Sequence, residues 1–394
     1  MKTKAYPKYK PSGVEWLGDV PEHWEVTSLK FICRFAYGDS LASEDREDGD
    51  YLVFGSNGPV GTHKLPNTTK PVIVVGRKGS YGKINYSDNP IFAIDTTYFI
   101  DTRYTTQSIQ WLKFSLLTLS LDIGSKDSAV PGLAREDAYE KKLPLPPLPE
   151  QQAIAAFLDR ETGHIDALIA KKKNLLSLLA EQRTALISRA VTKGLNPSVK
   201  LKPSGVEWLG DVPEEWEVKR VKHIVFLRSG EGITTDDIDD TGDYPVYGGN
   251  GFRGYTTNFT HTGHYVLIGR QGALCGNINY ANGNFWASEH AVVASPWKPL
   301  ATIWLGELLR LMNLNQYSIS AAQPGLAIDR IKELQIPVPP LPEQQAIAAY
   351  LDRETAKIDA LSAKVLTAIK RLKEYRTALI SAAVTGKIDV QDAV

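Results

Sequence analysis

Apolar side chains recur at alternating steps of three and four residues in two stretches of the chain, 149–190 and 342–383. Both stretches lack proline after their first residues and are rich in Ala, Leu, Glu, Gln, Lys and Arg. This composition favours α-helix, and the spacing is typical of a coiled coil. We therefore predict two long helices that pack on each other. A helix of about 40 residues, at about 1.5 Å per residue, makes a rod of roughly 60 Å.

The predicted contact line between the two helices consists of the residues reached by these alternating steps of three and four. In the first helix it contains Ile154, Leu158, Glu161, Ile165, Leu168, Lys172, Leu175, Leu179, Gln182 and Leu186. In the second helix it contains Ile347, Leu351, Glu354, Ile358, Leu361, Val365, Ala368, Leu372, Tyr375 and Leu379. The second line is the more apolar, which favours a true coiled-coil seam over a chance pair of helices.

The regions outside these stretches have a different pattern, with short β-rich runs between glycine-rich turns. The runs predict strands at 71–75, 91–94, 98–100, 265–268 and 291–294. Two proline-rich segments, 144–149 and 337–342, precede the helices and are expected to act as stiff connections, because proline continues neither a helix nor a central strand. The pattern indicates globular α/β or α+β domains beside the helices.

The chain contains a long internal repeat. Residues 10–26, KPSGVEWLGDVPEHWEV, return at 202–218 with Glu215 in place of His23 as the only difference; we call these two segments the scaffold repeats. Residues 146–156, PPLPEQQAIAA, return unchanged at 339–349. The segments between them resemble each other only weakly. This pattern indicates a tandem duplication in which one scaffold carries two different inserts. Two different inserts predict two different ligands.

The repeat sets the expected domain order. It predicts a first variable domain at 1–148, a central helix at 149–193, a second variable domain at 194–341 and a C-terminal helix at 342–394. The expected fold class is two tandem α/β (α+β) domains joined by two long helices.

The composition supports a folded multidomain protein. The 394 residues are 43% hydrophobic, and 45 basic residues balance 45 acidic ones, which excludes a globally basic nucleic-acid binder. Cys33 and Cys275 are too few for a disulfide framework or a four-ligand zinc site, so we expect no structural metal. The chain shows neither a membrane-spanning run nor an apolar core behind its basic first residues, and we expect a cytoplasmic location.

The variable domains contain two corresponding glycine-rich tracks without acidic residues. Turn-rich segments at 51–62 and 244–255 precede VVGRKGSYGKINY at 74–86 and LIGRQGALCGNINY at 267–280. Their basic residues predict a local basic surface in an otherwise neutral chain. The glycines would let the backbone approach a phosphate or a base edge closely. A glycine-rich turn with one arginine is, taken alone, more often only a turn.

Comparison of the two tracks separates common from distinct roles. Arg77 and Arg270 occur in both, so we expect them to hold a phosphate or another shared feature. Lys78 differs from Gln271, and Lys83 from Asn277; these pairs are candidates for base readout, because lysine suits guanine acceptors whereas Gln and Asn suit adenine. Ordinary exposed polar variation is the competing interpretation. The candidate DNA-contacting set is Asn57, Lys64, Arg77, Lys78, Ser80, Lys83, Asn250, Arg253, Arg270, Gln271, Asn277 and Gln323.

Two further repeated features have plainer explanations. The four tryptophans of the scaffold repeats, Trp16, Trp24, Trp208 and Trp216, are expected to pack against a helix or a domain rather than to stack on bases. The Pro-Gly-Leu segments at 131–133 and 324–326 could cap a DNA-facing loop, although a simple turn fits equally well.

We find no motif for catalysis and expect no cofactor. No Gly-Lys pair has the glycine and Ser or Thr of a P-loop, and no Asn or Asp precedes a Pro-Pro-aromatic sequence as in adenine methyltransferases. Two alternatives stay open: a coiled-coil scaffold whose domains bind protein or glycan, and a cryptic nuclease or methyltransferase.

The combination of PSGVEWLGDVP with EHWEV, GRxG with a later NY, PGL, and PPLPEQQAIAAFLD before a long helix resembles the specificity subunits of type I restriction-modification systems. The resemblance covers nearly the whole chain. It implies two target recognition domains, each reading one half of a split double-stranded DNA site, separated by antiparallel helices. Two homologous domains related by a pseudo-twofold axis would suit such a bipartite site.

The resemblance also implies partners. The helices resemble the family's spacer, which docks two copies of the methyltransferase (modification) subunit. In such complexes the partner carries S-adenosylmethionine and methylates adenine, and restriction subunits supply ATP-dependent translocation and cleavage. This chain is then expected to be a non-catalytic subunit without a membrane partner.

Overall fold

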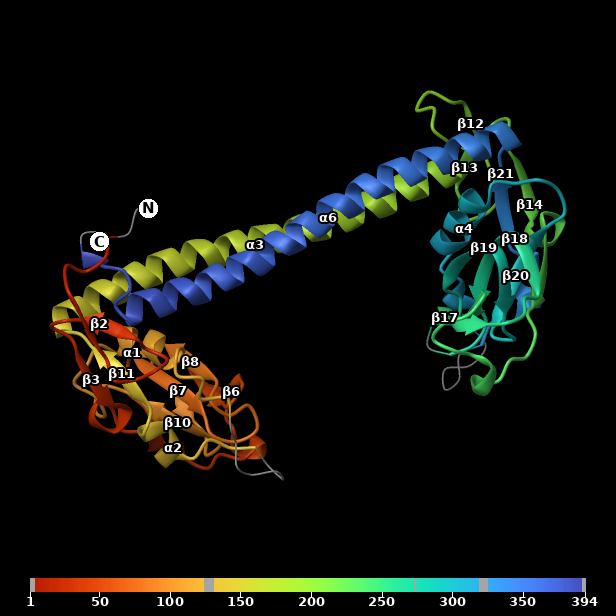
Figure 1. Ribbon diagram of the computed structural model, residues 1–394. Coiled ribbons are helices and arrows are strands. Elements are labelled where there is room, and N and C mark those ends of the chain that lie inside the picture. Colours follow the sequence, from red (N-terminus) through yellow and green to blue (C-terminus); the bar gives the residue numbers. More distant parts are fainter. Residues whose placement is uncertain (1–3, 124–130, 273, 319–324, 392–394) are drawn as a thin grey trace. The chain divides into compact units, whose positions relative to one another are not determined.

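The computed structural model describes residues 4–123, 131–272, 274–318 and 325–391 (Figure 1). It divides into two compact units: unit 1 is Met1–Lys173 with Leu366–Val394, and unit 2 is Asn174–Val365. Each long helix therefore begins in one unit and ends in the other. The predicted domain boundaries cut the chain differently, at the helix ends, and stay a prediction.

Two long α-helices, α3 (Leu148–Lys193) and α6 (Leu341–Val384), confirm the predicted helical stretches. A proline stands at the second residue of each, where its missing N–H removes no helical hydrogen bond. In unit 1 the Arg376 guanidinium donates to Asp166 at 3.0 Å. In unit 2 Arg183 pairs with Asp359 at 3.3 Å. Because the residue number rises along α3 as it falls along α6, the two helices pack antiparallel, side by side in Figure 1.

The predicted contact line of α3 is partly wrong. Ile165 and Leu179 are buried as predicted, but Leu168 and Leu175 are 43% and 38% exposed, and Ile169 is buried instead. A pattern of alternating three- and four-residue steps can begin with either step, and both choices have the same average period. Because Leu168 and the adjacent Ile169 are both apolar, both choices fit the sequence. The spacing alone therefore could not decide which residues face the other helix.

The same correction applies to α6. Ile358 and Val365 are buried as predicted, whereas Leu361 and Tyr375 are exposed. Because Leu361 corresponds to Leu168 in the repeat, the error is the same in both helices. It leaves one exposed leucine at an equivalent position on each helix.

Each scaffold repeat forms a short antiparallel ribbon followed by one strand that pairs near the helix start. In the first copy the pairs are β1 (Tyr9–Pro11) with β2 (Asp19–Pro21) and β3 (Glu25–Ser28) with β11 (Lys142–Leu145). In the second copy they are β12 (Leu201–Pro203) with β13 (Asp211–Pro213) and β14 (Glu217–Arg220) with β21 (Gln335–Val338). β11 and β21 contain proline and pair on one side only, as proline requires.

The insert of unit 1 forms two small sheets, with strand orders β4-β10-β7-β8 and β6-β5-β9. The strands are β4 (Ala36–Tyr37), β5 (Tyr51–Gly55), β6 (Gly58–His63), β7 (Val72–Gly76), β8 (Ile84–Ser87), β9 (Phe92–Ala93) and β10 (Thr97–Ile100). Every residue of β7 is buried, as expected for a continuous apolar run. Helix α1 (Ile109–Leu116) contacts β7 and β8, and α2 (Arg135–Tyr139) contacts the 3-10 helix η1 (Leu29–Phe31).

The insert of unit 2 repeats this topology in one six-stranded sheet of order β15-β20-β18-β19-β16-β17. The strands are β15 (Val225–Ser229), β16 (Tyr244–Gly248), β17 (Gly251–Thr256), β18 (His261–Gly269), β19 (Ile278–Ala287) and β20 (Ala291–Pro296). The helices of unit 2 are α4 (Thr302–Leu311) and α5 (Ile328–Glu333). Its 3-10 turns are η3 (Val221–His223), η4 (Thr235–Asp237) and η5 (Leu314–Tyr317), and unit 1 has the further 3-10 turn η2 (Ser43–Asp45).

The strands therefore confirm the five predicted β runs, each of which overlaps one of β7, β9, β10, β18 and β20. The mixed α/β content of both inserts is also as predicted. Within the described parts of the chain, no helix combines the length and the apolar character needed to cross a bilayer.

The scaffold tryptophans divide into a buried and an exposed pair. Trp24 and Trp216 are fully buried, and their indole N–H groups donate to Glu150 at 3.0 Å and to Glu343 at 2.9 Å, at the starts of α3 and α6. The prediction of structural packing is confirmed for them. Trp16 and Trp208 are 48% and 39% exposed, so for this pair the same expectation stays a prediction.

This division predicts unequal effects of one substitution made at two sites of unit 2. Trp216→Phe removes buried volume and leaves Glu343 without its indole donor, so we expect a loss of about 2–4 kcal/mol in the free energy of unfolding of unit 2. Trp208→Phe at the exposed site should change it by less than about 0.5 kcal/mol. Urea unfolding followed by circular dichroism measures both. Equal losses would show that Trp216 does not anchor the helix start.

Candidate functional site

The glycine-rich tracks form a β-hairpin in each unit. β5 pairs antiparallel with β6 and β16 with β17, and the turns lie at residues 56–57 and 249–250. The expectation of turn-rich segments is therefore wrong for most of residues 51–62 and 244–255. Asn57-Gly58 and Asn250-Gly251 are the signal that could have placed these turns, because Asn-Gly dipeptides mark turns; here each glycine begins the second strand.

The GRxG segments that follow form closed loops. In unit 1 the Gly76 N–H donates to Lys83 O at 2.9 Å, and in unit 2 the Gly269 N–H donates to Asn277 O at 2.8 Å. The same closure shows that Lys83 and Asn277 occupy equivalent positions, although the second loop has one extra residue. At Gly82 a Cβ would lie 2.2 Å from the backbone carbon of Leu121, so this position requires glycine.

The loop and the hairpin turn lie against each other in both units. The Lys83 ammonium donates to the backbone and side-chain oxygens of Asn57, at 2.8 and 2.7 Å. In the second unit Asn277 Nδ2 donates weakly to Asn250 Oδ1, at 3.5 Å. We call residues 55–60 with 76–83, and residues 248–253 with 269–277 other than Ala273, the hairpin–loop faces of units 1 and 2.

The Gly-Leu pairs at 132–133 and 325–326, from the two predicted Pro-Gly-Leu segments, contact these loops. The Leu133 N–H donates to Arg77 O at 2.8 Å, and the Leu326 N–H donates to Arg270 O at 2.9 Å. Lys78 and Gln271 form isolated bridges with Gly132 and Gly325. The described residues of these segments, predicted as possible loop caps, do contact the loops. Pro324 and the neighbouring candidate Gln323 lie outside the described residues.

The two shared arginines project from these loops and are half-buried. Arg77 Nη1 donates to Asp95 O at 3.0 Å, and its guanidinium lies 4.9 Å from the ring centre of Tyr37 and 5.9 Å from that of Tyr98. Burial and the neighbouring Tyr37 raise the pKa of Tyr98 to about 12, so this ring stays neutral beside the cation. Arg270 Nη1 donates to Ser229 Oγ at 3.2 Å. Both arginines are thus held in place by protein contacts.

The remaining described candidates are exposed: Asn57, Lys64, Lys78, Ser80, Lys83, Asn250, Arg253, Gln271 and Asn277. All except Lys64 belong to a hairpin–loop face. Lys64 follows the end of β6, and its ammonium pairs with Glu47 at 2.6 Å. Its charge is therefore matched locally.

The predicted local basic surface has acidic neighbours in space, because acidic segments distant in the sequence approach both hairpins. In unit 1 Glu47 accompanies Lys64, and Arg46 donates to Val60 O at 3.0 Å. In unit 2 Asp239 pairs with Tyr255 of β17 through two backbone hydrogen bonds of 2.9 and 2.8 Å. A window without acidic residues in the sequence is thus not an acid-free region in space.

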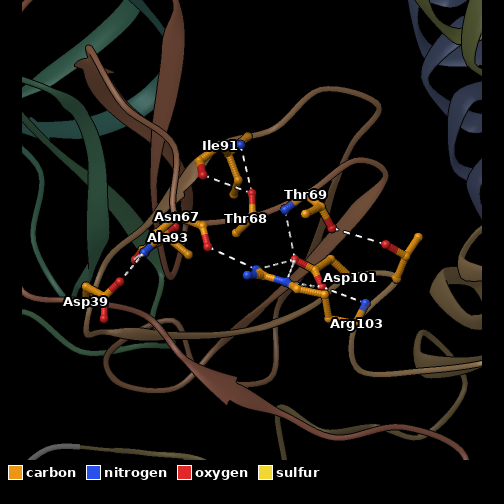
Figure 2. A network of polar contacts seen from close by, with 9 residues as sticks. Asp39, Asn67, Thr68, Thr69, Ile91, Ala93, Asp101 and Arg103 are labelled. Atoms are coloured by element: carbon orange, nitrogen blue, oxygen red, sulfur yellow. Dashed lines mark hydrogen bonds and ion pairs between the residues drawn. The ribbon is translucent and has the colours of Figure 1, made fainter.

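A polar network around the buried Asp101 supports β9, the strand that pairs with β5 of the hairpin in unit 1 (Figure 2). The fully buried Asp101 accepts from the Thr69 N–H at 2.9 Å and from Arg103 Nη2 at 2.6 Å. Burial alone would raise the pKa of Asp101, but the hydrogen bonds from Arg103 and Thr69 outweigh it, so the pKa is lowered. Arg103 also donates to Asn67 O, and Asn67 Nδ2 to Asp39.

Unit 2 supports the corresponding strand, the end of β19, differently. The Ala93 N–H donates to Asn67 Oδ1 in unit 1, and at the equivalent place the Ala287 N–H donates to Thr260 Oγ1. Beyond Thr260 the chain continues as the long strand β18 rather than through a buried carboxylate. The two inserts therefore share a topology but differ in what supports this strand.

Comparisons with known proteins agree with the duplication. The family model "Type I restriction modification DNA specificity domain" matches residues 21–178 and again 213–371. The type I restriction enzyme EcoprrI specificity subunit of Escherichia coli is 42% identical over 163 residues, 40% of this chain and 39% of that protein. A putative type I restriction enzyme specificity subunit of Haemophilus influenzae is 32% identical over 119 residues, 29% of this chain and 31% of that protein. The match thus spans less than half the length of either relative.

A solved structure reported for the complex assembly and conformational transition of a type I R-M system has a similar fold. Its TM-score is 0.64 at 16% identity, over 93% of this chain and 98% of that chain. At this level of identity the likeness concerns the fold, and it supports the predicted arrangement of two mixed α/β domains and two long helices.

The Lys83–Asn57 contact predicts a local change in backbone mobility. Lys83→Met removes both hydrogen bonds to the hairpin turn, so we expect several-fold faster amide hydrogen exchange in a peptide spanning Gly55–Pro59. Lys64→Met, which breaks only the exposed pair with Glu47, is the matched control and should leave that peptide unchanged. Unchanged exchange in the Lys83 variant would mean that the turn is rigid without this contact.

Proposed function

Because this chain belongs to the type I restriction modification DNA specificity family, we propose that it is the DNA-recognition subunit of a type I restriction-modification system. In this proposal each unit reads one half of a split double-stranded DNA site. The observation that carries it is the hairpin–loop face, which recurs with one topology and different exposed side chains on two copies of one scaffold.

The two faces divide into shared and differing residues, as two readers of different sequences require. Arg77 and Arg270 are equivalent and fixed by protein contacts, so we assign them to phosphate. The hydrogen bond to Asp95 uses one of the five N–H donors of the Arg77 guanidinium. Lys78 and Gln271 are exposed and equivalent but differ in chemistry. They are the proposed base readers, since guanine and adenine edges suit these two side chains respectively.

Lys83 and Asn277 are proposed to position the hairpin turns. They also stay candidates for direct contact with a base. Their polar groups already contact Asn57 and Asn250 within the face. A lysine that holds a turn loses less entropy on binding DNA, because the face is organised beforehand. Ser80, exposed on the same loop, stays a candidate contact.

Binding is proposed to need a partner that carries the methyl-transfer chemistry. The formal net charge is zero, whereas phosphate contacts supply much of the affinity for DNA, so a partner is expected to share them. In this reading the chain acts in the cytoplasm and is not itself an enzyme. Two methyltransferase subunits and further restriction subunits would complete the assembly.

The long helices are the proposed docking elements for the methyltransferase subunits. Leu168 on α3 and Leu361 on α6 are equivalent and exposed, at 43% and 44%. Exposed leucines repeated at one position favour a partner that binds twice. We also propose that the length of the helices sets the unread DNA spacer between the half-sites. The proposed functional domains are 1–148, 149–193, 194–341 and 342–394, and we propose that they follow a pseudo-twofold symmetry.

Exchange of one insert tests the two-reader proposal. The chain is co-expressed with the methyltransferase subunit encoded beside it, and methylated adenines are mapped by sequencing of the host DNA. Replacing residues 27–143 by the same region of another family member should change one half of the methylated motif, and replacing residues 219–336 should change the other half. The proposal fails if the intact complex methylates no split motif, or if one exchange alters both halves.

Charge placed on the helices tests the docking proposal. Leu168→Glu combined with Leu361→Glu should weaken binding of the methyltransferase subunit about tenfold or more, because both apolar contacts are lost. Leu178→Arg is the matched control: Leu178 is 52% exposed on α3, but Arg371 stands at the corresponding position of α6. Titration calorimetry measures both. An equal loss in the control would count against repeated docking at Leu168 and Leu361.

A further inference from the structure

Both hairpins contain a β-bulge at the same place. Val53 pairs with Gly61 and Phe54 with Pro59, so Val60 is the extra residue of β6; Arg253 is the extra residue of β17, between the pairs Tyr247–Phe252 and Val246–Gly254. A bulge bends a strand locally and re-aims its side chains, and bulges are over-represented next to functional sites. The bulged dipeptides are Pro59-Val60 in unit 1 and Phe252-Arg253 in unit 2.

The bulged dipeptide of unit 2 presents a large apolar ring to solvent. Phe252 is 56% exposed. Its ring centre lies 6.3 Å from that of Tyr247 and 5.1 Å from that of Tyr255. Tyr247 in turn packs edge-on against the fully buried Phe285 at 5.8 Å. The exposed ring is thus anchored through Tyr247 to the core of unit 2, which limits the rotamer entropy lost on binding.

The bulge is continuous with the proposed DNA-binding face. Asn250, in the turn beside it, contacts Asn277 of the GRxG loop. Gly248 has no side chain, and a Cβ there would lie 2.6 Å from Arg253 Cδ, so Arg253 lies across this strand. In unit 1 Val60 takes the same position, 3.4 Å from a Cβ built on Gly55. The bulge therefore has the same register in both hairpins, and the bulged side chains differ.

We propose that Phe252 contacts bases in the half-site read by unit 2, and that the bulged dipeptides help to set the two half-site sequences. This inference rests on the proposed function. A phenyl ring suits an apolar feature of a base pair, such as the thymine methyl group in the major groove. The acidic segment that pairs with Tyr255 through Asp239 disfavours a phosphate beside this edge. Together these features favour a base over the sugar-phosphate backbone.

The test compares two phenylalanines on opposite edge strands of one sheet. Phe252 lies on β17, and Phe226, 44% exposed, lies on β15. Each is changed to alanine in the full chain and co-expressed with the methyltransferase subunit, and the methylated motif is sequenced. Phe252→Ala should relax preference at one position of the unit 2 half-site by roughly 5- to 150-fold. The unit 1 half-site should be unchanged, and Phe226→Ala should leave both unchanged.

Two further measurements separate the possible outcomes. Because no charge is lost, the slope of log affinity against log salt should be unaltered in the Phe252→Ala complex, whereas Arg270→Gln should reduce it by about one. Pro59→Phe, the reciprocal change, should alter the unit 1 half-site only.

The inference is wrong if Phe252→Ala leaves an established unit 2 half-site unchanged. It is equally wrong if Phe252→Ala and Phe252→Leu both abolish methylation altogether, since the ring would then serve the fold. A split motif in the wild-type complex keeps the proposed function intact in either case. If the wild-type complex has no split motif, the proposed function and this inference fail together.

Discussion

A hydrogen bond from a buried tryptophan to a glutamate fixes the geometry of each half of this protein. Trp24 donates to Glu150, and Trp216 donates to Glu343, at the starts of the two long helices. Each bond joins a scaffold repeat to a helix, and the strand after the tryptophan pairs with the strand that leads into that helix. The insert between the two strands is thereby anchored at both ends. A scaffold that holds both ends of an insert tolerates divergence between them.

The surroundings of the two glutamates differ by the one substitution that separates the scaffold repeats. His23 contacts Glu150 at 2.9 Å, and Gln391 donates to the other oxygen of the same carboxylate at 2.7 Å. In unit 2 the position of His23 is taken by Glu215. Unit 1 holds the C-terminal segment of the chain by hydrogen bonds, which include the Asp389 N–H donating to Lys4 O at 2.8 Å. In unit 2 the end of α3 instead continues along the chain into the second scaffold repeat.

The inserts show how one backbone can offer two chemistries. Three features recur in both units: loop closure by Gly76 and Gly269, the hydrogen bonds from Leu133 and Leu326 to the loops, and the bulge in each hairpin. The side chains at Lys78 and Gln271 differ, as do those at Val60 and Arg253. The contacts that hold the face are mostly backbone hydrogen bonds, which do not depend on side-chain identity. Exposed side chains can therefore change without loss of the face.

The sequence by itself determined the duplication, the two long helices and the equivalence of the GRxG loops, because each depends on local composition or on identity between distant segments. It did not determine the helix faces, since neighbouring leucines such as Leu168 fit either heptad phase. It also gave no sign that Glu47 pairs with Lys64, or that Asp239 lies beside Tyr255. Only the tertiary structure decided these features and the exposure of Phe252, because each depends on which segments the fold brings together.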